Sequence, residues 1–173
     1  MRKSSSQDSK RGRGRGERQE REFEQRVIDL ARVTRVVAGG KRMRFRACVV
    51  IGDQKGKVGM AVAKGADVAS AVYKAVNQAK KHMIHVVTVK DTIPHDVRVH
   101  FKSAQLYMKP APQGSGIIAG GAVRSVMDLA GVKNVVCKMM GSANKINNVK
   151  AVIAGLSKFR KDPIYARSAI KKA

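Results

Sequence analysis

The sequence has few of the residues on which catalysis, metal binding and disulfide stabilisation depend. There is no tryptophan, and only two of the 173 residues are cysteines, Cys48 and Cys137. Two cysteines build no disulfide framework and do not have the spacing of a metal site, so we expect a reducing, cytoplasmic compartment. No order of Ser, His and Asp and no carboxylate pair suggests an active site. We therefore expect no catalytic residues, no metal and no cofactor.

Long hydrophobic runs are also lacking. The longest stretch without Asp, Glu, Lys or Arg is 110–123, and it includes four glycines and two prolines. A helix needs about 20 apolar residues to cross a bilayer, so we expect no membrane partner. The opening residues Met-Arg-Lys-Ser-Ser-Ser have no apolar core, and we expect no secretory signal.

Acidic residues are scarce and unevenly placed. The chain has 36 Lys and Arg against 12 Asp and Glu, a formal net charge of +24 at pH 7, and no glutamate follows Glu24. Residues 1–26 carry a net charge of only +4, whereas residues 27–173 carry +20. The positive charge therefore belongs to the part that folds, and it implies a polyanionic partner. The apolar fraction of 43% is sufficient for a buried core in that part.

Composition divides the chain into four predicted segments. Residues 1–26 combine a serine triplet with an Arg-Gly alternation, which predicts a disordered basic tail. Two α+β domains are expected at 27–91 and 92–160, and residues 161–173 form a basic C-terminal tail.

The first domain is predicted to contain three strands and a helix. Residues 27–37 are β-branched and basic, and a turn follows at Ala38-Gly39-Gly40. From 42 to 51, apolar residues beginning with Met43 alternate with a set that begins with three arginines, which predicts a core face and a basic face. A hairpin turn at 52–56 leads to a strand at 57–63. Asp67 is then expected to cap a helix whose inward stripe is Val68, Val72, Ala75, Val76, Ala79 and Met83.

The second domain is predicted to be rich in strands, with two helices. Strands are expected at 86–89, 97–101, 104–108 and 135–139, the second and third of which could form one bent strand. A helix beginning at Ser115 or a neighbour is expected to end at Gly131. Asn144 is expected to cap the last helix. The inward residues of these two helices are predicted to be Ile118, Ala122, Val126, Leu129, Ile146, Val149, Ile153, Leu156 and Phe159.

A glycine-rich segment and two histidines leave alternatives open. Residues 114–119, Gly-Ser-Gly-Ile-Ile-Ala, satisfy the dinucleotide pattern by letter, and they could also form the phosphate loop of a small-molecule phosphotransferase. We favour a tight turn that opens a glycine-rich helix, because the carboxylates for magnesium are lacking. His82 and His85 have the spacing of a helical metal pair, but no Cys or carboxylate completes the site, so surface or RNA-facing imidazoles are favoured.

The basic residues of the first domain are the main candidates for function. Three of them lie on one strand face, and nine cations in a module with one aspartate at its hairpin turn would repel one another without an anionic partner. Gly39 and Gly40 would let the backbone approach phosphate closely. Only seven Phe and Tyr are present, and none are spaced as a base-stacking platform, so contact with the phosphates of structured RNA or of DNA is favoured. The nine cations are Arg32, Arg35, Lys41, Arg42, Arg44, Arg46, Lys55, Lys57 and Lys64.

These residues carry a resemblance to a known family. The first half of the chain resembles the first domain of the bacterial-type fifth protein of the small ribosomal subunit, S5. The residues that carry this resemblance are Gly39-Gly40-Lys41-Arg42, Val49-Val50-Ile51-Gly52-Asp53, Gly56-Lys57-Val58-Gly59 and Lys64. The second half is similar over a longer set of motifs, and the resemblance runs from about residue 27 to 156. Those motifs are Gly116-Ile117-Ile118-Ala119-Gly120-Gly121-Ala122, Arg124, Ala130-Gly131-Val132, Asn134-Val135, Gly141-Ser142, Asn144 and Asn147.

The resemblance implies a fold and a function. The fold is a double-stranded-RNA-binding-like β-β-β-α domain followed by an α+β domain of a superfamily shared with some small-molecule kinases. Members are structural constituents that bind 16S rRNA where the body of the small subunit meets its head, beside the path by which mRNA enters. They neighbour the fourth and eighth proteins and influence decoding accuracy with the fourth and twelfth. A free RNA chaperone or rRNA-processing factor would use the same basic face, and it stays an alternative here.

The resemblance also assigns residues and shows departures. The loop 34–41, which adds Thr34 to the RNA-binding set, would reach rRNA near the spectinomycin site, and the helix at 116–124 would lie toward the fourth protein. The sequence departs from the usual family pattern at three places. Ala38 occupies a position where lysine is usual, and residues 60–63 differ from the more aromatic and glycine-rich strand of the family. Ala69 and Lys145 occupy helix starts where proline is common. The protein-interface residues implied are Gly116, Gly120, Gly121 and Arg124.

Overall fold

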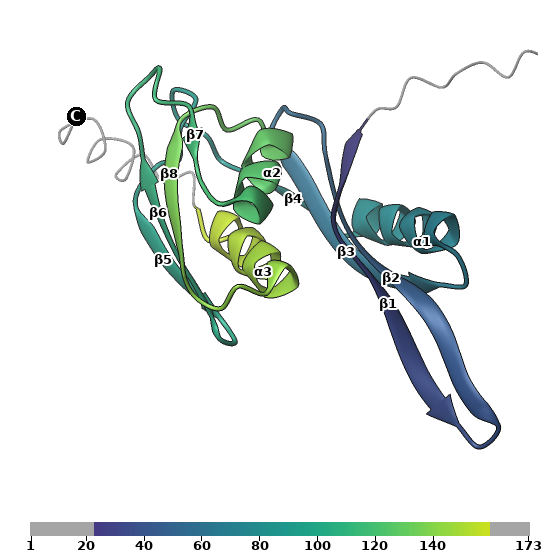
Figure 1. Cartoon of the computed structure of the whole chain (residues 1–173). Helices are drawn as coiled ribbons and strands as arrows, with labels where there is room; N and C mark the ends of the chain where they lie inside the picture. The colour runs from purple at the N-terminus through teal and green to yellow at the C-terminus, as the bar shows by residue number, and fades with distance from the viewer. Residues whose placement is uncertain (1–22, 160–173) are drawn as a thin grey trace, which may run out of the picture.

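The computed structural model describes residues 23–159, which form two sheets and three helices (Figure 1). Residues 1–22 of the predicted N-terminal tail, and all of the predicted tail at 161–173, lie outside the described residues. The first strand, β1, begins at Glu24, inside the segment assigned to the tail from composition. The element order β1-β2-β3-α1 followed by further strands and two helices agrees with the predicted α+β class.

The first sheet is antiparallel throughout, in the order β1-β2-β3-β4. Its strands are β1 (Glu24–Val37), β2 (Gly40–Gly52), β3 (Lys57–Gly65) and β4 (Met83–His85). The three predicted strands are confirmed, and short β4 adds an edge beside β3. The strand expected at 86–89 is wrong. Val86 is instead buried at the start of a connection, where its N–H donates to the carbonyl of Gly56 at 2.7 Å.

Helix α1 (Val68–Lys81) covers one face of this sheet through a stripe of alanines. Ala71, Ala75 and Ala79 are fully buried and pack against β2 and β3, because small side chains let the helix approach the sheet closely. Both ends of the predicted stripe are wrong, since Val68 is 38% exposed and Met83 belongs to β4, beyond the end of the helix. Asp67 occupies the N-cap position, but its side chain makes no capping hydrogen bond, contrary to expectation.

The second half of strand β2 is buried on both faces, whereas the predicted alternation had only one buried face. Ala47 and Val49 face α1, while Cys48 and Val50 face the second domain, and all four are fully buried. Met43, predicted to be in the core, is 46% exposed. The reason is that β3 pairs with β2 only from Phe45 onward, so Met43 lies beyond the end of the three-stranded region.

The second sheet has the order β5-β6-β8-β7, in which only β7 and β8 are parallel. Its strands are β5 (Val97–Phe101), β6 (Ala104–Pro110), β7 (Ile117–Ile118) and β8 (Val135–Gly141). Helices α2 (Gly121–Ala130) and α3 (Lys145–Leu156) pack on one face of the sheet. β5 and β6 are therefore two separate strands, and the alternative of one bent strand is wrong.

The predicted end of α2 is confirmed, but its predicted start is wrong. Gly131 ends the helix in the left-handed conformation, with φ at +79°, as expected. The start is wrong, because Ser115 lies in a loop, Ile117 and Ile118 form β7, and the helix begins at Gly121. Ile118 consequently points outward and is 55% exposed. The cap of α3 is confirmed, since the Asn144 Oδ1 atom accepts from the N–H groups of Ile146 at 3.0 Å and Asn147 at 3.4 Å.

The two domains share a hydrophobic core. Val50 and Val58 of the first sheet belong to the same buried cluster as Val126 and Leu129 of α2. Figure 1 shows α1 on one side of the first sheet and the second domain on the other. The backbone also joins them, since the N–H of Gln54 donates to the carbonyl of Leu129 at 3.0 Å. A Cβ atom on Gly52 would lie 2.1 Å from that same carbonyl oxygen, so this contact requires glycine.

Candidate nucleic-acid interface

The β1–β2 hairpin extends beyond the rest of the sheet as a two-stranded arm (Figure 1). Residues 34–44 are all exposed, and β3 and α1 do not cover them. A two-stranded hairpin without a covering layer contributes little to folding, so the side chains of the arm are available for binding. The turn at 38–39 follows the predicted signal, and Gly40 has a φ of +141°, a backbone conformation that side chains rarely adopt.

Arginines gather on one face of this arm. The register pairs Arg35 with Arg42, and the alternation of the strand brings Arg44 and Arg46 to the same face. Like charges directly opposite each other on a sheet are destabilising. Arg35, Arg42 and Arg44 form no ion pair with any residue between 23 and 159. A phosphate backbone would relieve this repulsion, because it places negative charge along the stripe of cations.

The opposite face of the arm carries the other predicted residues. Arg32, Thr34 and Lys41 are exposed there, on positions paired with Phe45, Met43 and Val36 respectively. The guanidinium of Arg32 contacts the sulfur of Met43. Gly39 and Gly40 lie at the tip, where a Cβ atom at either position would meet nothing within 4 Å. The backbone at the tip is therefore open to a close partner.

Arg46 differs from the three arginines nearer the tip, because it is paired. Its Nη2 atom lies 3.3 Å from the Asp29 carboxylate, and its side chain is 34% exposed. The regular β1–β2 register brings the two residues together, since Asp29 lies opposite Cys48 and Ala31 lies opposite Arg46, which makes Asp29 and Arg46 diagonal neighbours on one face. Arg46 was predicted to be displayed with the other arginines, and Asp29 was missed as its partner, because the pattern of a single strand does not show which side chains of the neighbouring strand lie beside it.

The remaining predicted cations divide into two groups. Lys64 is paired with Arg46 in the β2–β3 register and extends the arginine face onto β3. Lys55 and Lys57 lie at the opposite end of the sheet, about 20 Å away along the strand, so they do not join the arm. Their backbone N–H groups each donate to the Asp53 carboxylate at 2.8 Å. Partial burial of Asp53 opposes its ionisation, but these hydrogen bonds lower its pKa below the usual value.

The glycine-rich loop at 114–119 is not arranged to bind phosphate. The N–H groups of Gly114 and Gly116 both donate to the side-chain oxygen of the buried Asn134, at 3.1 and 3.2 Å. A phosphate loop needs such amides free and directed at a ligand at the start of a helix. Here they are already used, and the loop is followed by β7 rather than by a helix. The dinucleotide and phosphotransferase readings therefore have no structural support.

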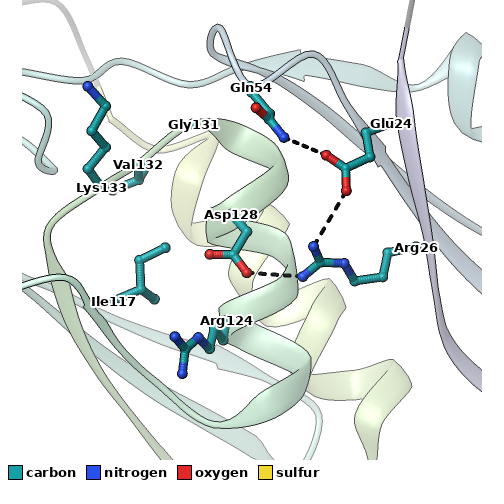
Figure 2. Close-up of a pocket in the computed structure, with 9 residues that line it drawn as sticks. All are labelled: Glu24, Arg26, Gln54, Ile117, Arg124, Asp128, Gly131, Val132 and Lys133. Carbon is teal, nitrogen blue, oxygen red and sulfur yellow. Dashed lines mark hydrogen bonds and ion pairs between the residues drawn. The ribbon is translucent and has the colours of Figure 1, made fainter. Parts of the chain in front are cut away.

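The predicted protein-interface residues lie around the start of α2. Gly120 is the N-cap, and a Cβ atom there would come 2.2 Å from the methyl group of Met139. Gly121 and Arg124 are exposed on the first turns, and Gly116 precedes β7. Arg124 lines an open cavity of about 510 Å³ between β1 and α2. Figure 2 shows Arg124 on α2, one turn from Asp128. Across the cavity, Arg26 connects Glu24 at 3.5 Å with Asp128 at 3.0 Å.

Reactive and metal-binding groups are lacking in the part of the chain that the structure describes. Residues 23–159 contain no cluster of three or more His, Cys, Asp or Glu side chains. His82 ends α1 and His85 lies on β4, so they do not share a helix face. Burial raises the pKa of Cys48 to about 11 and that of Cys137 to about 12, so neither thiol is ionised at neutral pH. No helix within these residues is long and apolar enough to span a membrane.

The fold and these surfaces define a class: a small, strongly basic two-domain α+β protein with an exposed row of arginines that have no carboxylate partner among residues 23–159. Comparison with known proteins narrows the class. A family model described as "Ribosomal protein S5, N-terminal domain" matches residues 23–87, and one described as "Ribosomal protein S5, C-terminal domain" matches residues 99–166. The "Small ribosomal subunit protein uS5c" of Emiliania huxleyi is 49% identical over 140 residues, 80% of this chain and 88% of that protein. The chain belongs to the ribosomal protein S5 family.

Family membership decides between the alternatives raised by the sequence. The chain is a non-enzymatic, structural constituent of the small ribosomal subunit, with rRNA and ribosomal proteins as its partners. The phosphotransferase is therefore excluded as its function, and no finding supports the free RNA chaperone or rRNA-processing factor. The RNA-binding and interface residues, and the domain boundaries at 26/27, 91/92 and 160/161, stay predictions.

Proposed function

We propose that the protein binds 16S rRNA chiefly through the arginine face of the β1–β2 arm. The observation that carries this proposal is the row Arg35, Arg42 and Arg44, which is exposed and has no carboxylate partner among residues 23–159. Spare cations on an arm that lacks a hydrophobic core cost folding energy, and binding to a polyanion offsets that cost. Arg32, Lys41, Thr34 and the two glycines of the tip extend the contact to its other face.

The chemistry of the arm favours the RNA backbone over the bases. Arginine forks donate in pairs to phosphate oxygens, and such contacts fix position without reading sequence. Within residues 23–159 the arm has no aromatic side chain exposed for stacking, since Phe45 is half-buried. Structured rRNA offers closely spaced phosphates and 2′-hydroxyls, which fit a rigid, strongly charged strand pair.

Charge reversal on the arm tests this proposal. The variant Arg35→Glu/Arg42→Glu/Arg44→Glu should bind a full-length 16S rRNA transcript at least roughly 100-fold more weakly at 0.15 M salt. The dependence of log K on log salt should become shallower by about three, because each lost phosphate contact removes about one from the slope. The matched control is Lys74→Glu/Lys81→Glu/Lys109→Glu, three exposed lysines on α1 and β6. Equal losses in the two variants would contradict a special role for the arm.

We also propose the finer placement in the subunit. The protein lies where body meets head, beside the path by which mRNA enters, with the fourth and eighth proteins as neighbours. Family membership supports this placement, and so does the exposure of Gly121 and Arg124 at the start of α2. The surface around Gly116, Gly120, Gly121 and Arg124 would face the fourth protein, and through it the protein would influence decoding accuracy.

The variant Arg124→Leu tests that interface. Arg124 forms no ion pair within residues 23–159, so the change should leave the fold intact while weakening the contact with the fourth protein. We expect a severalfold increase in misreading in a reporter assay. Lys138→Leu, on the outer face of the second sheet, serves as the control and should not change misreading. Wild-type fidelity in Arg124→Leu would contradict the proposed interface.

We propose that the ribosomes containing this protein are cytoplasmic. Both cysteines are free and buried, which suits a reducing compartment. Fractionation of cells into cytosol and organelles, followed by immunodetection in each small-subunit peak, tests this. Detection only in organellar ribosomes would overturn it.

A further inference from the structure

A cation of the second domain meets the arginine face of the first. Lys145, the first residue of α3, places its Nζ atom 3.9 Å from Asp29 Oδ1, while Arg46 Nη2 lies 3.3 Å from Asp29 Oδ2. One carboxylate on β1 therefore holds together a cation from β2 and a cation from the other domain. The Lys145 side chain remains 60% exposed, so this contact leaves most of it accessible.

Two more lysines lie on the same side of the molecule. Lys64 on β3 is the register partner of Arg46 and is exposed. Lys150, one and a half turns further along α3, lies 5.6 Å above the ring of Phe101. The side chain of Cys48 lies on the same face of β2 as Arg46. Burial raises the pKa of the Cys48 thiol, and the positive charges of Arg46 and Lys150 partly oppose this rise. This electrostatic effect is consistent with Lys150 facing the same region as Arg46.

Positive charge is in excess where the domains meet. The Asp29 carboxylate pairs with Arg46 and Lys145, whereas Lys64 and Lys150 form no ion pair with any residue between 23 and 159. Arg46 is not fully satisfied by that carboxylate, since its Nε–H is buried and has no hydrogen-bond partner among the described residues. The surplus continues outward through Arg44, Arg42 and Arg35, which lie on the same face of the arm.

We propose that α3 completes the RNA-binding face of the arm, so that a single rRNA backbone contacts both domains. The phosphates would follow the row of arginines toward the domain junction and end on Lys145 and Lys150. The partner is structured RNA, because several separated cations along one face match a regularly charged strand and not a single anion. This inference deepens the proposed function and rests on the arm being an RNA-binding surface.

Four variants of the full-length protein test the composite surface with a 16S rRNA transcript as the probe. The first is Lys145→Glu/Lys150→Glu on α3, and the second is Arg35→Glu/Arg42→Glu on the arm. The third is a control, Lys109→Glu/Lys138→Glu, with the same charge change in the second domain but on the exposed outer face of its sheet. Lys145→Gln/Lys150→Gln repeats the first variant with a smaller perturbation, and thermal unfolding checks that each protein is folded.

The expected result is that the α3 variant binds roughly tenfold more weakly than the control and that its salt slope is shallower by about two. The Gln variant should show the same direction of change with a smaller loss. If the arm variant loses affinity while the α3 variant matches the control, the composite surface is overturned and the proposed function stands. If neither variant differs from the control, both proposals fail.

Discussion

At the residue scale, Asp29 determines how the cations at the domain junction are arranged. Its side chain is 24% exposed and contacts Arg46 and Lys145, which come from different domains. Removing the charge of one partner of a half-buried pair leaves the other partly desolvated without compensation. Asp29 is therefore expected to matter more for stability than its place on the surface strand suggests.

Asp29→Asn should lower the free energy of unfolding by roughly 1–2 kcal/mol, because Arg46 then remains half-buried without a counter-charge. Urea unfolding followed by circular dichroism measures this change. Asp91→Asn is the matched control, since Asp91 pairs with Lys133 at 3.3 Å between side chains that are 51% and 70% exposed. Exposed pairs contribute at most about 1 kcal/mol and often nothing, so the control should change little. Equal effects would show that Asp29 is an ordinary surface acid.

Single residues could be predicted from the sequence where the chemistry is local. The Asn144 cap and the left-handed Gly131 follow from propensities within one turn of a helix, and both are observed. Asp67 shows the limit of this reasoning, since it occupies the cap position without making the bond. Cys48 and Val50 lie on the face of β2 that begins with the three arginines, opposite the predicted core face, and they are buried because a second domain covers that part. Strand periodicity cannot reveal such a cover.

At the scale of elements, the arm separates binding from folding. Val36 is 75% exposed and Met43 is 46% exposed, so the arm holds apolar side chains without burying them. The stability of the first domain comes instead from α1 and from the half of β2 that lies next to β3. A change confined to the arm should therefore affect RNA binding and leave the fold intact.

Replacing residues 34–43 by Asn-Gly tests that separation. A two-residue turn of this type joins paired strands without strain, and Val33 and Arg44 are already register partners. We expect the free energy of unfolding to fall by less than about 1 kcal/mol, because every residue removed is exposed. Affinity for 16S rRNA should fall at least roughly tenfold. A large loss of stability would contradict the view that the arm contributes little to folding.

The elements with strong periodicity were predictable, and the short ones were not. The long strands β1 and β2 and the helices α1 and α3 appear close to their expected limits. The start of α2 was placed too early, because Ile118 fits a helical stripe although it belongs to the two-residue strand β7. The strand expected at 86–89 is instead a connection after β4, where pairing with β3 has ended at Met83–His85. Pairing partners, which are tertiary information, decide such cases.

At the scale of the whole molecule, the two domains are joined by a common hydrophobic core, so we expect them to unfold together. Leu129 is fully buried in the cluster that also contains Val50 and Val58, and its carbonyl accepts the hydrogen bond of Gln54. Gly131 approaches from the same side, since a Cβ atom there would lie 2.1 Å from the Gln54 carbonyl oxygen. This close joint fixes α2 against the first sheet, and α3 lies beside α2.

Leu129→Ala should destabilise both domains together, by roughly 2–5 kcal/mol, because it opens a cavity in their common core. Hydrogen exchange measured on α1 and on α3 should show the same loss of protection in both helices. Val136→Ala, at a position 38% exposed on the outer face of the second sheet, should cost far less. Loss of protection in α3 alone would mean that the domains unfold independently.

Those features of the candidate RNA-binding surface that depend on composition and strand pattern could be predicted from the sequence. The absence of glutamate after Glu24 and the alternation of arginines from Arg42 indicate a basic face from the sequence alone. The division of that face was not predictable. Lys55 and Lys57 lie at the far end of the sheet, whereas Lys145, over 80 positions away from Lys64 in the chain, lies at the junction. Only the packing of α3 beside β1 brings that lysine to the arginine face.

The most direct test of the account is sedimentation of tagged protein from cells through a high-salt sucrose gradient. Wild-type protein and the control Lys74→Glu/Lys81→Glu/Lys109→Glu should travel in stoichiometric amounts with the small subunit. Arg35→Glu/Arg42→Glu/Arg44→Glu should be depleted from that peak and remain near the top of the gradient, because the arm has lost its hold on rRNA. Stoichiometric incorporation of the arm variant after the salt wash would contradict the claim that the arm anchors this protein to its RNA.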